Sequence, residues 1–142
     1  NISRVLLFGA IGATICYFLA AISNIPIIGL LACGLTGFCT SMLWPGSLIA
    51  ATDRNPGGGV FLFAMMAAGG DLGASFGPQL VGIVTDYVMQ SKDIVQLVNK
   101  YGYTAEQVGM KCGMLTGMIL PFLGIFVFLY ILKSKRKVQG ED

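Results

Sequence analysis

Histidine is absent from the 142-residue sequence. An imidazole metal site and a catalytic triad built on histidine are therefore excluded. The four cysteines have neither metal nor redox spacing, and most lie inside apolar runs, so we interpret them as small buried hydrophobic residues. No nucleophile has a base beside it in the sequence. We expect a protein that is not an enzyme and that binds neither a metal nor a cofactor.

Charge is also scarce, because 11% of the residues are charged and 55% are hydrophobic, whereas soluble domains have roughly 25% charged residues. No charge occurs between Arg4 and Asp53 or between Lys111 and Lys133. A helix needs about 20 residues to cross a bilayer, so the first run can cross twice, with a turn at 23–26. The sequence predicts an all-α membrane protein with four transmembrane helices, at about 5–22, 27–51, 60–88 and 105–132.

The long loop from Met89 to Tyr103 has its own pattern. Apolar residues recur there at helical spacing, which predicts a short amphipathic helix at the membrane surface; they are Ile94, Val95, Leu97, Val98 and Tyr101. Thr104 and Gln107 then have the spacing of a capping box. We expect the fourth span to begin there.

The distribution of Lys and Arg predicts the orientation. One side of the predicted bundle carries Arg4, Arg54, Lys133, Lys135, Arg136 and Lys137, and the other carries Lys92, Lys100 and Lys111. The side richer in Lys and Arg should be cytoplasmic, so we expect a multi-pass protein of the inner (plasma) membrane with both chain ends and the basic tail 133–142 in the cytoplasm. Basic tails also bind anionic lipid or nucleic acid, but a cluster flush against a span requires only the lipid bilayer as partner.

Asp71 is the one carboxylate expected near mid-bilayer, roughly 16 Å along the third span from Val60. A charge at that depth costs around 2.5 to 3.5 kcal/mol, and such residues usually face protein or water and mark ion or substrate paths. Two interpretations stay open: a proton or substrate site, or a carboxylate paired with a group on a neighbouring helix. No Lys or Arg lies at mid-membrane depth in this sequence, so a basic partner would come from elsewhere.

Two of the predicted spans carry a polar stripe at about 100° per residue. In the third span the stripe comprises Ala64, Ala67, Ala68, Asp71, Ser75, Pro78, Gly82 and Thr85, and in the second span Gly29, Cys33, Thr36, Thr40, Trp44 and Ser47. These side chains could line a solute pathway, for which the candidates are Thr36, Thr40, Trp44, Ser47, Asp71 and Ser75. The hydroxyls could equally bond to their own helices, and Trp44 could belong to an aromatic belt.

Glycine and proline suggest where these helices bend or pack. Pro45-Gly46 should kink the second span just beyond Trp44, as a hinge or a packing feature. Gly69, Gly73 and Gly77 are four apart and allow close helix approach, and Pro78 allows a bend. The first and fourth spans are plainer and look like scaffold, with packing expected at Gly9, Gly12, Gly117 and Gly124.

The segments Met42-Leu43-Trp44-Pro45, Gly57-Gly58-Gly59 and Ala67-Ala68-Gly69-Gly70-Asp71-Leu72-Gly73, with Gly77-Pro78, Gly82 and Asp86, resemble the C-terminal half of major facilitator superfamily transporters, notably bacterial sugar-permease-like members. The resemblance implies that the four spans correspond to helices nine to twelve of a twelve-helix fold. The tenth helix would line the central cavity, the eleventh would lie between the two halves, and the missing helices would be partners. The first residue is Asn1 rather than methionine, which suggests a truncated chain.

Two functional hypotheses follow. The first is the C-terminal portion of a secondary active transporter that moves a small polar solute, such as a sugar, by alternating access, with proton coupling left open. The second is a self-standing four-helix membrane protein that assembles through its glycine faces, as a scaffold or a small dimeric efflux pump. The first requires a much longer parent chain.

Overall fold

The computed structural model describes the backbone of residues 2–138 and, within that range, the side chains of all but Leu97 and 135–138. The contribution of the Leu97 side chain to the predicted amphipathic pattern, and positions 139–142 of the predicted basic tail, lie outside the described residues. Every regular element within 2–138 is helical; the helices are α1 (Ile2–Ile22), α2 (Pro26–Ser41), α3 (Leu43–Arg54), α4 (Gly59–Gln90), α5 (Lys92–Lys100) and α6 (Ala105–Val138).

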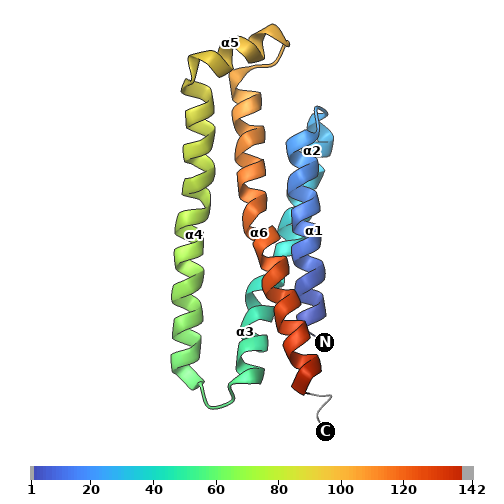
Figure 1. Ribbon diagram of the computed structural model, residues 1–142, viewed down its shortest axis with the longest axis vertical. Helices are drawn as coiled ribbons and strands as arrows, with labels where there is room; N and C mark the ends of the chain where they lie inside the picture. The colour runs from blue at the N-terminus through green and yellow to red at the C-terminus, as the bar shows by residue number, and fades with distance from the viewer. Residues whose placement is uncertain (1, 139–142) are drawn as a thin grey trace.

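Four helical segments are long and apolar enough to cross a membrane: Ile2–Ile22, Pro26–Arg54, Gly59–Gln90 and Ala105–Ser134. The second of these comprises α2 and α3 together. The four predicted spans are thus confirmed as helices. They alternate in direction, so Ile2 and the last turns of α6 lie at one end of the bundle and α5 lies across the other (Figure 1).

Helix α6 lies between α4 and α1 and packs against both (Figure 1). Helices α2 and α3 pack on α1, and α4 has smaller contacts with α3 and α5. The two plainer spans, α1 and α6, therefore form the centre of the described bundle. The two spans with polar stripes form its sides.

Glycines allow close helix approach at the centre of this bundle. A side chain at Gly9 would lie 2.8 Å from the carbonyl oxygen of Cys39, so only glycine fits between α1 and α2 there. On α6, a side chain at Gly113 would lie 2.5 Å from Oγ1 of Thr85, and one at Gly117 would lie 3.3 Å from the Tyr17 ring. Packing at Gly9 and Gly117 was expected. The contact of Gly113 with α4 was not.

The glycines of α4 are more open than those of α6. Apart from the neighbouring backbone of α4, no atom of the described residues lies within 4 Å of the place a side chain would occupy at Gly69 or Gly73, and at Gly77 the nearest such atom is Cδ1 of Leu120, at 3.4 Å. Any packing partner of Gly69 or Gly73 is therefore outside the described residues. Pro78 lies inside α4, and the helix continues through it.

The second span is broken at Met42, between α2 and α3. Pro45 has no N–H to donate to the carbonyl of Ser41, the last residue of α2, so the regular helix ends there. A kink was predicted just beyond Trp44; the break lies earlier because the missing bond belongs to the carbonyl four residues before the proline. Gly46 is buried, and a side chain there would lie 2.7 Å from Cδ2 of Leu6. Gly46 thus holds α3 close to α1.

The connections at the α5 end follow local rules. Helix α5 ends in a Schellman motif, with Gly102 at φ 77°. The N–H of Gly102 donates to the carbonyl of Asn99, and the N–H of Tyr103 donates to the carbonyl of Val98. The predicted capping box then starts α6, because the Thr104 N–H donates to Oε1 of Gln107 and the Gln107 N–H donates to Oγ1 of Thr104, both at 3.2 Å. Tyr103 is consequently held between two helix caps.

Candidate functional site: a groove between α2 and α4

Two adjoining cavities, each of about 520 Å³, form a groove in the bundle. The mid-span cavity has Thr36 of α2 on one side and Gly73, Gly77 and Pro78 of α4 on the other, with residues of α1 and α6 between them. The α5-end cavity continues it along α2 and α6 to the turn between α1 and α2. Both are lined by Ala20, Cys33 and Met114. The two cavities therefore adjoin, and together they form the groove.

The hydroxyl groups of the predicted stripe on the second span donate to their own helix. Oγ1 of Thr36 bonds to the carbonyl of Ala32 at 2.8 Å, Oγ1 of Thr40 to that of Thr36 at 2.9 Å, and Oγ of Ser47 to that of Trp44 at 2.8 Å. Each oxygen keeps its acceptor capacity. Of these three, Thr36 alone lines the groove.

Trp44 packs on α4 instead of lining either cavity. A side chain at Gly70 would lie 3.0 Å from Cζ3 of the Trp44 ring, so the indole covers the backbone of α4 at that glycine. The Trp44 residue remains 46% exposed. Trp44 is thus part of the α3–α4 contact, at the end of the groove away from α5.

Asp71 and Ser75 lie on an exposed side of α4, beside the residues that line the groove. Oγ of Ser75 donates to the backbone carbonyl of Asp71 at 2.9 Å. The Asp71 carboxylate has neither a hydrogen-bond nor an ion-pair partner among the described side chains. The structure therefore does not bring Asp71 together with Thr36 or Trp44.

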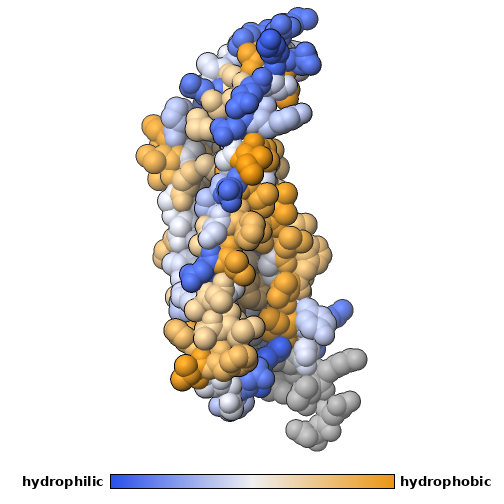
Figure 2. Space-filling view, turned by 90° about the vertical axis from the view of Figure 1, so that its left-hand side faces the viewer, coloured by the Kyte–Doolittle hydropathy of each residue, from blue (hydrophilic) through white to orange (hydrophobic). Residues whose placement is uncertain are grey.

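The polar stripe of α4 contains more polar residues than was predicted. Gln79 and Asp86 follow Asp71 and Ser75 at helical spacing and are exposed as well. Figure 2 looks onto this side of the molecule, where isolated hydrophilic side chains lie among pale and hydrophobic ones between two hydrophilic ends. The spacing of Gln79 was a usable signal that the sequence interpretation missed.

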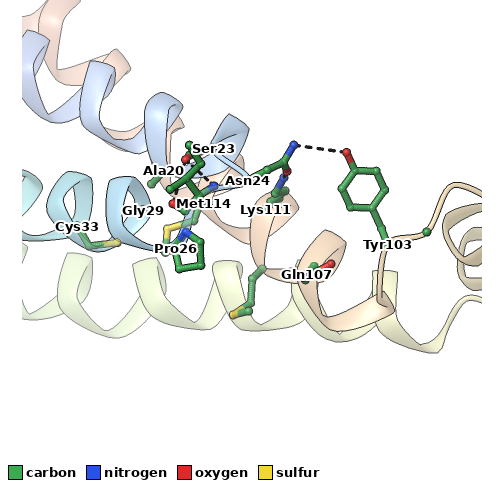
Figure 3. A pocket seen from close by; sticks show the side chains of 13 residues that line it. Ala20, Ser23, Asn24, Pro26, Gly29, Cys33, Tyr103, Gln107, Lys111 and Met114 are labelled. Atoms are coloured by element: carbon green, nitrogen blue, oxygen red, sulfur yellow. Dashed lines mark hydrogen bonds between the residues drawn. The ribbon is translucent and has the colours of Figure 1, made fainter.

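A second polar cluster lies in the α5-end cavity and was not predicted. Nζ of Lys111 donates to Oδ1 of Asn24, whose Nδ2 donates to the Tyr103 hydroxyl at 3.5 Å (Figure 3). Nζ also lies 5.4 Å from the centroid of the Tyr103 ring. Asn24 is 87 residues from Lys111 in the chain. Their meeting therefore depends on the fold rather than on a local pattern.

The turn between α1 and α2 positions Asn24. Oγ of Ser23 accepts the N–H of Ile25 and donates to the carbonyl of the same residue, both at 3.2 Å, and the N–H of Ser23 closes the end of α1 on the carbonyl of Leu19. Pro26 then occupies the first turn of α2, where no N–H is needed. The amide of Asn24 is thus presented to α6 by a short and well-bonded turn.

Comparison with known protein families, with curated proteins and with solved structures found no match for this chain. The resemblance to major facilitator transporters therefore rests on the residues quoted above.

Proposed function

We propose that this chain forms the C-terminal portion of a secondary active transporter of the major facilitator type, which moves a small polar solute by alternating access. The groove between α2 and α4 is the observation that carries the proposal. Its two cavities of about 520 Å³ fall within the range of about 300 to 1,000 Å³ that is typical of small-molecule sites. Small residues of α4, Gly73 and Gly77, keep it open.

The carboxylate of Asp71, which has no partner among the described side chains, also supports a larger assembly. An exposed charge at this depth of a spanning helix is costly if lipid surrounds it. The remaining helices of the transporter would supply a partner or a water-filled path, and proton coupling would use the same carboxylate. The charges support the proposed orientation as well: Arg4, Arg54 and Lys133 lie at the end opposite α5, which we place in the cytoplasm.

A self-standing four-helix protein is the second candidate, and the open glycines favour it. Apart from the local helix backbone, no described atom lies within 4 Å of the place a side chain would occupy at Gly29, Gly34 and Gly37 of α2. The same holds at Gly69 and Gly73 of α4. A second copy of the chain could pack against these surfaces. The mass of the complete encoded polypeptide, measured after purification in detergent, separates the two candidates, because a transporter of this type needs roughly 400 residues and the second candidate needs about one third of that.

Transport is tested with the complete encoded protein in liposomes. Solutes are first screened for thermal stabilisation of the protein, and those that stabilise it are then assayed for uptake with and without a proton gradient. Gly73→Leu fills the mid-span cavity and should abolish saturable uptake. Gly34→Leu is the matched control, because Gly34 has an open surface among exposed Leu30, Leu31 and Phe38 and lines neither cavity. Absence of uptake by the unaltered protein, or equal uptake by the Gly73→Leu variant, contradicts the proposal.

A further inference from the structure

The α5-end cavity contains one ammonium group without an acidic partner. Lys111 is half-buried on α6, and its contacts are the amide oxygen of Asn24 and the ring of Tyr103. No carboxylate lies within ion-pair distance of Nζ among the described side chains. An ammonium group has three N–H donors, and the structure gives it a single acceptor. Positive charge and donor capacity therefore remain directed at the cavity.

The neighbouring side chains add neutral polar groups and apolar surface to that charge. Asn24, Gln107 and Ser23 line the same cavity and offer neutral polar groups, while Met110 and Met114 add apolar surface. A small organic anion could accept hydrogen bonds from Lys111 and from these amides. Its apolar part could at the same time pack against the two methionines. A charge-assisted bond to a carboxylate is about twice as strong as a bond between neutral groups. The cavity thus favours an organic carboxylate over a neutral solute of equal size.

We propose that the α5-end cavity binds a small organic monocarboxylate and that Lys111 is the residue that selects for its charge. The proposal rests on the proposed transport function and names the substrate class for it. Asn24 and Tyr103 are positioning residues, because they hold the ammonium group at the mouth of the groove. The bound carboxylate would pass next along Cys33, which lines both cavities.

Cys33 provides a reporter for binding. The complete protein is prepared with Cys16, Cys39 and Cys112 replaced by alanine, together with any cysteine outside this sequence, and is placed in liposomes of zwitterionic lipid so that no anionic headgroup competes. The rate at which N-ethylmaleimide modifies Cys33 is measured with increasing concentrations of matched solutes. Each pair is an acid and its own amide: lactate with lactamide, and glucuronate with glucuronamide.

At least one carboxylate should slow the modification of Cys33 at a concentration roughly tenfold lower than its amide requires, which is the factor expected for a charge-assisted bond. Lys111→Gln should remove this difference. Lys100→Gln is the control, because Lys100 is exposed at the end of α5 and lines neither cavity. The carboxylate proposal is overturned if no acid protects better than its amide, or if the advantage of the acid survives Lys111→Gln.

Uptake of the same solutes separates this proposal from the transport function. If neutral solutes are taken up and Lys111→Gln leaves their uptake unchanged, the transport function is supported and the carboxylate site is contradicted. If carboxylates protect Cys33 in a manner that depends on Lys111 while no solute is taken up, the carboxylate site is supported and the transport function is contradicted.

Discussion

The two sides of α4 differ in what covers them. Toward α6, the side chain of Thr85 and the backbone and side chain of Val81 meet Gly113 so closely that no side chain fits between the helices. On another side, Asp71, Ser75, Gln79 and Asp86 form a stripe that is exposed among the described residues. Small residues allow close packing in the first case. In the second case polar groups in a spanning helix require protein or water that this four-helix bundle does not provide.

The tightest contact should show the largest effect. Gly113→Leu forces α6 away from Thr85 and Val81 and should lower the free energy of unfolding by about 3 kcal/mol, the upper end for overpacking. Gly124→Leu is the control on the same helix, because the nearest atom to a side chain at Gly124 belongs to Phe128 at 3.7 Å. Denaturant unfolding of the purified protein in detergent measures both. Equal stabilities of the two variants would show that α4 and α6 do not pack as described.

The polar side of α4 is tested through transport. If Asp71 couples solute movement to protons, Asp71→Asn should reduce proton-driven uptake in liposomes on the order of tenfold, because the amide cannot exchange the proton. Asp86→Asn, which removes the other carboxylate of the stripe near the α5 end, should have a smaller effect. Uptake by the Asp71→Asn variant that equals that of the unaltered protein over a range of pH would rule out the coupling role and leave helix pairing as the explanation.

The α3–α4 contact gives a test with two adjacent glycines. A methyl group at Gly70 would lie 3.0 Å from the Trp44 ring, whereas one at Gly69 meets nothing within 4 Å. Gly69→Ala should be neutral or stabilise by up to about 1 kcal/mol, because alanine favours the helix. Gly70→Ala should be less stable than Gly69→Ala by about 1 kcal/mol because Trp44 must shift. A reversed order in thermal unfolding would place Trp44 elsewhere.

The smallest expected effect concerns the end of the bundle opposite α5. Nη2 of Arg54 donates to the carbonyl of Ile131 at 2.8 Å and so joins the end of α3 to α6. The site is exposed, so Arg54→Gln should cost only about 0.5 kcal/mol of stability. Arg4→Gln is the control, since Arg4 is exposed near the same end of the bundle. Identical unfolding of both variants would mean that this bond adds nothing measurable.

The features that the sequence predicted well depend on neighbouring residues. The four spans follow from long apolar runs, and the capping box at Thr104 and Gln107 depends on residues three apart. The kink was predicted at nearly the right place, but Pro45 affects the carbonyl of Ser41, so the break lies at Met42. The capping box and the break each depend on residues three or four apart, which is about one helical turn, and each span depends on a single uninterrupted stretch of sequence.

The features that the sequence did not predict depend on which helices meet. Helical projection places glycines on faces, but it does not show that Gly113 contacts α4 while Gly69 remains open. The same holds for Lys111 and Asn24, which become neighbours only because the α1–α2 turn and the start of α6 lie at one end of the bundle. The candidate site is therefore divided. Thr36 was predicted and lines the mid-span cavity, whereas the polar cluster of the α5-end cavity was found only in the structure.

The break at Met42 has a mechanical consequence for the groove. The second span consists of two helices, α2 and α3. Helix α3 packs against α1 through Gly46 and against α4 through Trp44. The segment that borders the groove, α2, joins α3 at Met42 and packs along α1 around Gly9, so a bend at Met42 would leave the contacts of α3 in place and would move α2 along α1. The mouth near Lys111 could thus widen or narrow while the opposite end keeps its spacing, which is the kind of independent motion that access from one side at a time requires.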